Sequence, residues 1–535
     1  MPIDPLDTPA PPLLTANAMQ AADRYTIEDY GIPSFTLMES AGRGCAESIQ
    51  EEYGPLQDEA VVVLCGKGNN GGDGLVVARR LCAAGARVHV VLVGDPEALR
   101  DDPARNLALL RTLRDEGEGD RLTIESLDTL GELAETANRL APRLYVDALL
   151  GTGLTSALRE PIHSVVEWVN DRPAPVVAID VPTGLHSDTG AVLGAAVEAD
   201  RTVTMAAPKA GLYVGAGPDR AGTVTVVDIG IPEFVLDRAA ERAGCARLTT
   251  DAAVRAWWPA RSADAYKYSV GAALVVGGSR RFVGAPAMAA SAASRSGAGY
   301  VTCACPAPIQ SMLAAADPSV PTLPLPANEE GQASPDGVET IREQRADALL
   351  VGPGLGRAPD PRRFVHRLLE ATDRPLVIDA DGLNALADAE ADWTEHAAAH
   401  WILTPHEGEF RRLAGDVDLT DRVRTVQEHA RRWGVVLLLK GPPSIVAAPD
   451  GRTHVGSTGT PALATAGTGD VLAGQCVGLL AQGLDPLEAA AAALHLGGAA
   501  ARRYVDTRDA RTLTAPDLIE ELPRATHERL GTPIS

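Results

Sequence analysis

The sequence predicts an α/β protein with two domains, each built on a parallel β-sheet. Short β-branched runs alternate with helical stretches between residues 60 and 230, and a second set of runs begins at residue 272. This alternation is typical of parallel sheets whose strands are connected by helices. A hydrophobic content of 45% with only 4% aromatic residues suits aliphatic sheet interiors. We therefore expect two different domains, residues 1–240 and 250–535, with a boundary near 235–250.

The first half contains six runs that we predict to be strands. They are rich in β-branched residues, and turns or Ala- and Arg-rich helical stretches separate them. The predicted strands are residues 60–65, 87–93, 143–150, 175–180, 201–206 and 222–230.

The second half shows the same alternation with a new set of runs. Ala- and Arg-rich segments between them are predicted to be helical. The connecting stretch 233–265 has mixed polarity, and we predict no strand in it. The predicted strands of this half are residues 273–278, 299–306, 346–354, 374–380, 400–405 and 434–441.

The charge balance argues against two classes of partner. The chain has 71 Asp and Glu against 48 Lys and Arg, so its formal net charge is −23. Nucleic acids and anionic membranes are bound through basic clusters, and none is visible. Only four basic residues are lysines, a composition typical of proteins from salt-loving organisms. Lysines kept on such a background are candidates for specific roles: Lys67, Lys209, Lys267 and Lys440.

No targeting or membrane segment is predicted. Residues 1–16 are expected to be a frayed leader, because they lack the basic region and long apolar stretch of a signal peptide. No uncharged apolar run reaches about 18 residues, the length that a spanning helix needs. We therefore expect a soluble, cytoplasmic homo-oligomer that binds small molecules.

A glycine-rich turn follows the first predicted strand. Residues 66–74, GKGNNGGDG, lead into a helical stretch, where backbone N–H groups and the helix N-terminus attract phosphate. The default interpretation of this pattern is a dinucleotide-binding oxidoreductase. Asn69, Asn70 and Asp73 oppose it, because they place oxygen ligands and a negative charge in a phosphate turn. A nearby cation or a sugar hydroxyl would relieve that conflict.

Two more carboxylates lie at the ends of predicted strands. Asp147 and Asp180 end the third and fourth strands, and the carboxyl ends of parallel strands converge on one crevice. Each Asp alone is better explained as a helix cap. The set together predicts a cation held by oxygens of Asn70, Asp147 and Thr183.

Several motifs of this half resemble one family. GKGNNGGDGLVVAR, VDALLGTGL, AIDVPTGL followed by SDTG, and APKAGL are similar to the N-terminal domain of the bifunctional NAD(P)H-hydrate repair enzymes, as is the opening stretch 19–42. The resemblance implies a Rossmann-like, three-layer domain over residues 1–240. It also implies that this domain interconverts the R and S forms of hydrated NADH and NADPH and binds potassium.

The resemblance assigns a role to each matching residue. It makes Asp180 the catalytic acid/base residue and a substrate contact; proton transfer and stabilisation of an iminium-like cation are both open to it. Potassium is assigned to Asn70, Asp147 and Thr183, where Thr183 keeps the hydroxyl of the usual Ser. Lys209 is a candidate partner of a substrate phosphate, or else a solvated lysine. The other substrate contacts are Asn69, Asn70, Gly71, Gly72, Asp73, Gly151, Thr152, Gly153, Leu154, Thr155, Ser156 and Ala157.

In the second half, residues 465–470, TAGTGD, precede an apolar helix rich in small residues. A helix N-terminus beside a carboxylate suits deprotonation of a hydroxyl and stabilisation of a transferring phosphoryl group. GTGD alone could be a capped helix start. Together with GPGLG (352–356), VIDADGLNAL (377–386), LTPHEGEF (403–410) and LLLKGPPSIVAAPDG (437–451), it resembles the ribokinase-like fold.

These motifs also resemble the ADP-dependent dehydratase domain of the same repair family, here residues 250–535. The resemblance implies that ADP, with Mg²⁺, phosphorylates the C6 hydroxyl of the S hydrate and that loss of phosphate restores NADH or NADPH. It makes Asp470 the catalytic base and a substrate contact. Ala285, Gly354 and His406 are the other substrate contacts. The nucleotide contacts are Lys440, Gly441, Pro442, Pro443, Ser444 and Gly469.

Two other interpretations stay open from the sequence. One is a small-molecule kinase of the ribokinase-like group with a regulatory first domain, which VGPGLG and PHEGE beside GTGD disfavour. The other is a first domain that binds without turnover, which the presence of Asn70, Asp147 and Asp180 disfavours. His406 could simply cap the following helix, and Lys440 could face solvent. The sequence leaves undetermined the choice between ADP and ATP, the preference between the two hydrates, and the roles of Lys267, Asp379 and Asp381.

Overall fold

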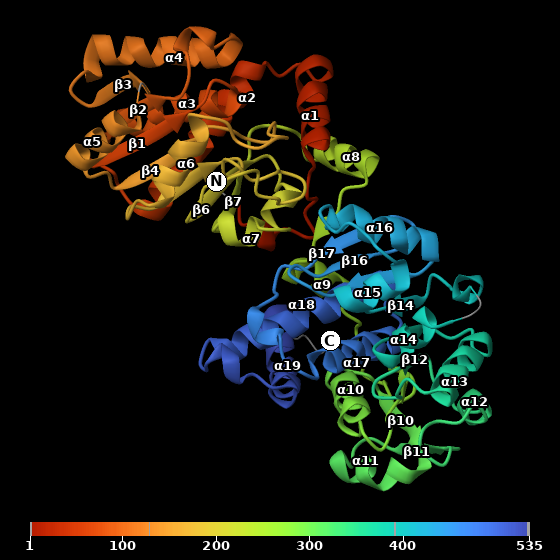
Figure 1. Ribbon diagram of the computed structural model, residues 1–535. Helices are drawn as coiled ribbons and strands as arrows, with labels where there is room; N and C mark the ends of the chain where they lie inside the picture. The colour runs from red at the N-terminus through yellow and green to blue at the C-terminus, as the bar shows by residue number, and fades with distance from the viewer. Residues whose placement is uncertain (1–2, 128, 390–391, 532–535) are drawn as a thin grey trace. The chain divides into compact units, whose positions relative to one another are not determined.

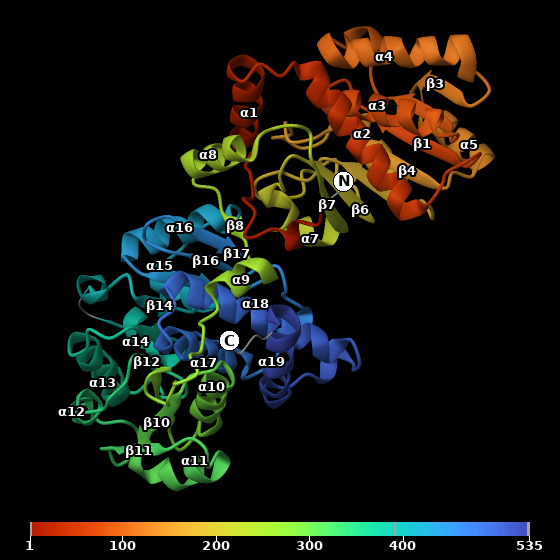
Figure 2. The same ribbon diagram turned by 180° about the vertical axis from the view of Figure 1, so that it is seen from behind.

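The computed structural model describes residues 3–127, 129–389 and 392–531 (Figure 1). The chain divides into two compact units, residues 1–247 and 248–535. Each unit surrounds a largely parallel sheet with helices, and Figure 2 shows the same ribbon from behind. The predicted fold class, two α/β domains with parallel sheets, is therefore confirmed.

The sheet of the N-terminal unit is parallel and has the order β3-β2-β1-β4-β5-β6-β7 in the described residues. The order reverses direction between β1 and β4, and in open sheets of this kind ligands bind at such a point, beyond the carboxyl ends of the strands. All six predicted strands of this half are present. β3 was not predicted, because it is a half-exposed edge strand with a polar sequence, LTIES. The strands are β1 (Ala60–Cys65), β2 (Arg87–Leu92), β3 (Leu122–Ser126), β4 (Leu144–Ala148), β5 (Val176–Ile179), β6 (Arg201–Met205) and β7 (Thr223–Val227).

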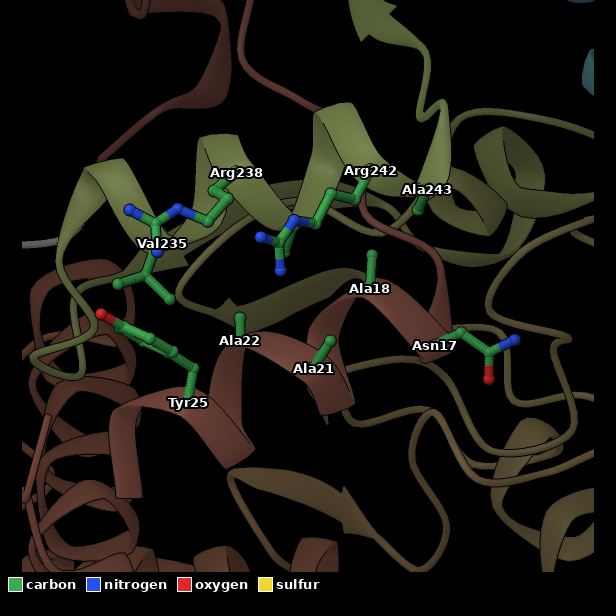
Figure 3. A pocket seen from close by; sticks show the side chains of 10 residues that line it. Asn17, Ala18, Ala21, Ala22, Tyr25, Val235, Arg238, Arg242 and Ala243 are labelled. Carbon is green, nitrogen blue, oxygen red and sulfur yellow. The ribbon is translucent and has the colours of Figure 1, made fainter. Parts of the chain in front are cut away.

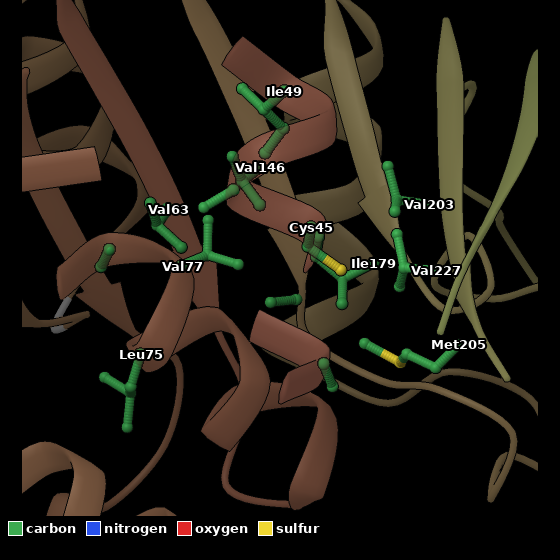
Figure 4. Close-up of a cluster of buried hydrophobic side chains, with 14 of the residues drawn as sticks. Cys45, Ile49, Val63, Leu75, Val77, Val146, Ile179, Val203, Met205 and Val227 are labelled. Carbon is green, nitrogen blue, oxygen red and sulfur yellow. The ribbon is translucent and has the colours of Figure 1, made fainter. Parts of the chain in front are cut away.

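Helices cover both faces of this sheet. Along β1, Val61 and Val63 pack with α1, α2, α3, α4 and α8, a core whose centre Figure 4 shows, while Val62 and Leu64 pack with α5 and α6. The alternation of side chains along a strand thus produces three layers. The helices are α1 (Ala16–Arg24), α2 (Ser34–Tyr53), α3 (Asn69–Ala83), α4 (Asp101–Leu113), α5 (Leu130–Leu140), α6 (Ile162–Asn170), α7 (Gly217–Arg220) and α8 (Glu233–Ala243).

Residues 3–15 are part of the fold, so the prediction of a frayed leader was wrong for them. Ile3 pairs with Val226 on the edge strand β7, and Leu13 and Leu14 are fully buried. The Leu14 N–H donates to the Pro208 carbonyl, and the Leu14 carbonyl accepts from Ala210. The segment has no helical or strand period; it is ordered because the edge of the sheet offers it hydrogen-bond partners and an apolar site.

The sheet of the C-terminal unit has the order β11-β10-β9-β12-β13-β14-β15-β16-β17-β8 in the described residues. It is parallel from β11 to β15 and antiparallel over β15, β16 and β17. All six predicted strands are present. The strands are β8 (Arg247–Leu248), β9 (Ala272–Val276), β10 (Tyr300–Pro306), β11 (Thr322–Leu325), β12 (Ala348–Val351), β13 (Leu376–Ile378), β14 (Trp401–Leu403), β15 (Val436–Leu439), β16 (Ile445–Ala447) and β17 (Thr453–Val455).

The short strand β8 lies in the stretch 233–265, where no strand was predicted, so that prediction was wrong. β8 has only two residues, too few for any periodicity, and it is a strand because the fold places it beside β17.

Small residues let α17 pack closely against α10. A Cβ at Gly474 would lie 2.2 Å from the Ala289 carbonyl oxygen, and one at Gly478 would lie 2.7 Å from that of Ala293. α17 is therefore held deep in the core. The helices are α9 (Asp251–Trp257), α10 (Gly284–Arg295), α11 (Gln310–Ala316), α12 (Gly337–Arg342), α13 (Pro359–Glu370), α14 (Asp381–Ala387), α15 (Glu407–Ala414), α16 (Arg422–Trp433), α17 (Thr468–Ala481), α18 (Pro486–Val505) and α19 (Ala515–Leu530).

Replacing Gly474 by Ala should lower the free energy of unfolding of this domain by about 1–3 kcal/mol, because the added methyl group overlaps the backbone of α10. Gly284→Ala, in α10 itself, is the matched control, since a Cβ there meets no atom within 4 Å. Urea unfolding of the two variants measures the difference. Equal stability of Gly474→Ala and the parent chain would contradict the close helix packing.

Candidate active sites

The turn between β1 and α3 is shaped by glycine. A Cβ at Gly71 would lie 1.9 Å from the carbonyl oxygen of Gly66, so only glycine fits without a backbone shift. Asn70, Gly71, Gly72 and Asp73 are buried in the first turn of α3, whereas Asn69 is exposed. Within the described residues, neither Asn70 Oδ1 nor Asn70 Nδ2 has a hydrogen-bond partner although both atoms are buried. A buried amide of this kind indicates a missing ligand.

Asp180 and Lys209 form a buried ion pair at the carboxyl ends of β5 and β6. Lys209 Nζ lies 2.7 Å from Asp180 Oδ1 and also donates to Thr204 Oγ1 at 3.0 Å and to the Met205 carbonyl at 2.7 Å. The Lys209 side chain is 1% exposed. Lys209 is therefore not a solvated lysine, so that expectation was wrong, while its pairing with a substrate phosphate stays a prediction. The sequence did not show that the chain brings the carbonyl and hydroxyl partners of β6 to its ammonium group.

The backbone of Asp180 has a φ angle of 68°, which residues other than glycine rarely adopt. Such strain persists where the surroundings enforce it, most often at functional sites. On the far side of the carboxylate, a Cβ at Gly151 would lie 3.2 Å from Asp180 Oδ2 and 3.4 Å from Asn70 Cγ. Gly151 therefore keeps space open between the Asp180 carboxylate and the Asn70 amide.

Two further carboxylates, Asp23 and Asp73, interact electrostatically with this pair. Burial raises the pKa of Asp73 well above its ordinary value, and the charges of Asp180 and Asp23 raise it further. Burial also raises the pKa of Asp23 to about 6, which the charge of Lys209 partly opposes. Asp23 lies on α1, inside the stretch 19–42 that resembled the family, but no role was predicted for it. The site thus contains carboxyl groups with a higher affinity for a proton than an exposed Asp has.

Asp147 and Thr183 are in direct contact, as the predicted cation site requires. The Thr183 hydroxyl donates to Asp147 Oδ1 at 2.7 Å and accepts from the Leu150 N–H at 3.0 Å, and the Thr183 N–H donates to Asp147 Oδ2 at 2.8 Å. Burial raises the pKa of Asp147 to about 6, although these hydrogen bonds lower it. Asn70 lies next to Gly151, one residue beyond Leu150. The three predicted ligands therefore lie around the ends of β1, β4 and β5.

The loop after β4 is more open than its motif suggested. Gly151, Thr152 and Leu154 are partly buried, whereas Gly153 and residues 155–157 are exposed. A separate hollow of about 200 Å³ lies between α1 and α8, where Arg238 and Arg242 face Ala18 and Ala22 (Figure 3). None of the residues predicted for catalysis or binding lines that hollow.

In the C-terminal unit, a lysine and a carboxylate again meet at the carboxyl ends of parallel strands. Lys440 Nζ, after β15, lies 2.9 Å from Asp379 Oδ1, after β13. Asp379 is 2% exposed and also accepts from the Thr404 hydroxyl, after β14, at 2.8 Å. A Cβ at Gly469 would lie 3.5 Å from Lys440 Nζ, so the ammonium group is next to the first turn of α17. Lys440 therefore does not face solvent.

Asp470 follows Gly469 in the same turn of α17. Burial raises the pKa of Asp470 to about 7, the charges of Asp379 and Asp381 raise it as well, and that of Lys440 lowers it. The pKa of Lys440 is raised although burial lowers it, because the charges of Asp379, Glu409 and Asp470 outweigh burial. A carboxyl group with a pKa near 7 is suited to accept a proton at neutral pH.

The remaining predicted contacts lie in three places. His406 caps α15, since its Nδ1 accepts from the N–H groups of Gly408 and Glu409, and its backbone forms a bridge with Lys440. Gly354 and Ala285 are neighbours, because a Cβ at Gly354 would lie 3.5 Å from Ala285 Cβ. Beyond Lys440, the Ser444 hydroxyl donates to the Gly441 carbonyl, which closes the predicted nucleotide loop 440–444.

Comparison with known proteins identifies both halves. Residues 34–211 match the family model of the YjeF-related protein N-terminus, and residues 273–524 match that of NAD(P)H-hydrate dehydratase. The bifunctional NAD(P)H-hydrate repair enzyme Nnr of Salinibacter ruber is 66% identical over 526 residues, 97% of each chain. The chain belongs to the family of bifunctional NAD(P)H-hydrate repair enzymes. The family that the sequence motifs indicated is thus confirmed.

A second curated relative also spans both halves. The Nnr enzyme of Moorella thermoacetica is 40% identical over 96% of each chain. Because the two Nnr enzymes match both halves, the kinase and the binding-only alternatives are set aside. Among solved structures, the chain is similar to the ADP/ATP-dependent NAD(P)H-hydrate dehydratase of Bacillus subtilis, co-crystallised with ATP and Mg²⁺, which is 31% identical and covers 53% of this chain and 98% of its own, with a TM-score of 0.45.

No helix in the part of the chain that the structure describes combines the length and low charge needed to cross a bilayer. In the same residues, no three His, Cys, Asp or Glu side chains gather to hold a metal ion. The predicted potassium ligands Asn70 and Thr183 are of other residue types, so their assignment stays a prediction.

Proposed function

We propose that this repair enzyme restores hydrated NADH and NADPH in two steps at the two sites described above. The N-terminal domain interconverts the R and S hydrates with Asp180 as its acid/base residue, and the C-terminal domain dehydrates the S hydrate with ADP and Mg²⁺, with Asp470 as its base. One observation supports the placing of these functions: each domain brings a lysine and a carboxylate together in an ion pair beyond the carboxyl ends of its parallel strands.

In the first step, the hydroxyl group at C6 must leave and return to the opposite face of the ring. A proton delivered to that hydroxyl lets it leave as water, and the ring nitrogen shares the positive charge that remains. Asp180 is the group placed to exchange this proton or to stabilise that cation, and Lys209 fixes the orientation of its carboxylate. When water adds to the other face, it gives up one proton, so the reaction is balanced.

The residues of the N-terminal site fit a potassium ion. Asn70 has a buried carbonyl oxygen without a partner, and Asp147 is a buried carboxylate without a cationic partner among its hydrogen bonds. Hard cations are bound by oxygens of these kinds. When bound, potassium would supply positive charge beside Asp147 and the substrate; Asn70, Asp147 and Thr183 would hold it.

Replacing Thr183 by Val is expected to raise the potassium concentration that half-activates epimerisation by about 10–100-fold, because it removes one ligand and the partner of Asp147. Thr183→Ser keeps the hydroxyl and serves as the control. A second readout is the melting temperature in potassium against sodium, since an ion that binds only the folded state stabilises it. Equal potassium responses of the Val and Ser variants would remove Thr183 from the ligand set.

In the second step, the C6 hydroxyl of the S hydrate attacks the terminal phosphorus of ADP. Asp470 accepts the hydroxyl proton, AMP leaves, and the N–H groups at the start of α17 stabilise the transferring phosphoryl group. The C6–O bond of the phosphorylated hydrate then breaks, and a proton is lost from the adjacent ring carbon. Phosphate is a better leaving group than hydroxide, so the step that limits spontaneous dehydration becomes easier.

One assay tests both assignments. The purified chain is incubated with mixed R and S hydrates, ADP, Mg²⁺ and potassium at high salt, and the absorbance of reduced nicotinamide is followed. Rapid recovery of both forms supports the proposal. Rapid recovery of the S portion alone would show an inactive N-terminal domain, and no recovery would overturn the assignment of the C-terminal site.

A further inference from the structure

The ion pair between Asp379 and Lys440 has no place in the mechanism above. Asp379 is almost fully buried, and both of its hydrogen-bond partners come from the ends of neighbouring strands: Thr404 at 2.8 Å and Lys440 at 2.9 Å. Burying a carboxylate is unfavourable unless it is paired and hydrogen-bonded. Three successive strand ends, after β13, β14 and β15, thus cooperate to fix one ammonium group.

The position of that ammonium group is constrained from several sides. The Lys440 N–H donates to the Pro405 carbonyl at 2.9 Å, and Arg422 Nη2 donates to the Lys440 carbonyl at 2.9 Å, so the backbone of Lys440 is clamped. Its side chain then reaches the turn that contains Gly469 and Asp470. The Lys440 ammonium group therefore lies between two carboxylates: Asp379 binds it, and Asp470 remains available to the substrate.

The backbone around Asp379 is strained. Ala380, the next residue, has a φ angle of 50° and a ψ angle of −115°, outside the backbone regions that residues other than glycine favour. Asp381 accepts from the Gly356 N–H at 2.8 Å and from the Asn384 side chain at 3.2 Å. Strain of this kind is retained at sites where one orientation is needed. Here the strained residue lies between Asp379 and Asp381, whose carboxylates bind different partners, Lys440 and Gly356.

We propose that Asp379 is a positioning residue of the dehydratase reaction: it holds the Lys440 ammonium at the Gly469–Asp470 turn, where the phosphoryl group is transferred, and it prevents Lys440 from closing an ion pair with Asp470. The inference rests on the assignment of Asp470 as the base. With Lys440 held in this way, its ammonium group faces the phosphoryl group, and Asp470 keeps its affinity for a proton.

The charges around Asp470 support this arrangement. Asp379 and Asp381 raise the pKa of Asp470, and Lys440 lowers it. Glu409 acts on Lys440 from α15, and the exposed His406 ring has its Nε2 3.5 Å from Glu409 Oε1. Without the Asp379 charge, the carboxylates that still act on the ammonium are Glu409, which already accepts from the His406 N–H, and Asp470. The pKa of Asp470 would then fall, and Asp470 would be a weaker base.

The decisive variant is Asp379→Asn, tested in the full chain with the S hydrate and ADP. We expect kcat for dehydration to fall by about 100-fold or more, with a smaller change in KM for the hydrate, because the lost interaction acts on the transferring group. The acidic limb of the pH profile of kcat should also move to lower pH. Asp388→Asn, just beyond the C-terminus of α14 and in an exposed ion pair with Arg362, is the matched control.

Two further variants keep the inference testable if Asp379→Asn folds poorly. Thr404→Val retains both charges and removes one hydrogen bond, so we expect a smaller loss of kcat in the same direction. In the double variant Asp379→Asn with Lys440→Met, the losses should not multiply, because the pair acts as a unit. A folded Asp379→Asn enzyme with an unchanged kcat and pH profile would overturn the inference, as would multiplicative losses in the double variant.

The same experiment separates this inference from the assignment on which it rests. If Asp470→Asn retains dehydration, the base has been assigned wrongly and the role of Asp379 is overturned with it. If Asp470→Asn is inactive while Asp379→Asn and Thr404→Val match the parent chain, only the positioning role is wrong.

Discussion

Replacing Asp470 by Asn is expected to reduce kcat for dehydration by about 10²–10⁴-fold, the usual contribution of a general base. Asn has the same shape as Asp but cannot accept the hydroxyl proton of the substrate. The substitution removes a carboxyl group whose pKa burial raises to about 7, so it should leave the fold intact. Epimerisation, at the N-terminal site, should keep its rate.

The pH dependence of the parent enzyme gives an independent test of the same residue. A base must be deprotonated to act, so kcat should be low at acidic pH and should rise with pH around a midpoint of about 7. Asp470→Asn should flatten this limb. Dehydration by the Asn variant at the parent rate, or an acidic limb that stays in place, would show that another group is the base.

Replacing Asp180 by Asn is expected to reduce epimerisation by about 10²–10⁴-fold and to leave dehydration of the S hydrate unchanged. In the mixed-hydrate assay, the rapid phase should then recover only the S portion. Asp180 is the ion-pair partner of the buried Lys209, and removal of one partner of a buried pair costs about 3–5 kcal/mol. Some loss of stability is therefore expected in this variant.

A second variant separates catalysis from folding. Asp180→Asn combined with Lys209→Met removes both charges, so it should recover stability, measured by thermal unfolding, while epimerisation stays low. A double variant that regains stability and also regains epimerisation would show that Asp180 has only a structural role. Loss of both activities in either variant would contradict the division of labour between the two domains.

The catalytic carboxylates could be predicted from the sequence because each lies in a local motif. Asp180 directly follows a β-branched strand, and Asp470 follows a glycine turn before an apolar helix. Their partners could not be predicted. Lys209 is 29 residues beyond Asp180, and Asp379 is 61 residues before Lys440, so only the order of strands in the sheets brings them together. Nothing in the residues around Lys209 distinguishes a buried lysine from a solvated one.

The sequence likewise could not predict which carboxyl groups have raised pKa values. Nothing in the residues next to Asp23, Asp73 and Asp147 marks them, but burial raises the pKa of each because the charged form loses its hydration. Burial is a property of the packed domain. For the same reason, the sequence offered Lys209 only as a phosphate partner or a solvated residue.

The sequence by itself determined the features that depend on residues close together in the chain: the predicted strands, the glycine turns at residues 66–74 and 465–470, the family, and which carboxylates to test. Tertiary structure decided the rest. It ordered residues 3–15 on the edge strand β7, added β3, β8, β11, β16 and β17, and placed Lys209 and Lys440 each against a particular carboxylate. The physical reason is that a strand edge, a buried charge and an ion pair each need atoms from distant segments, whose contacts no local pattern encodes.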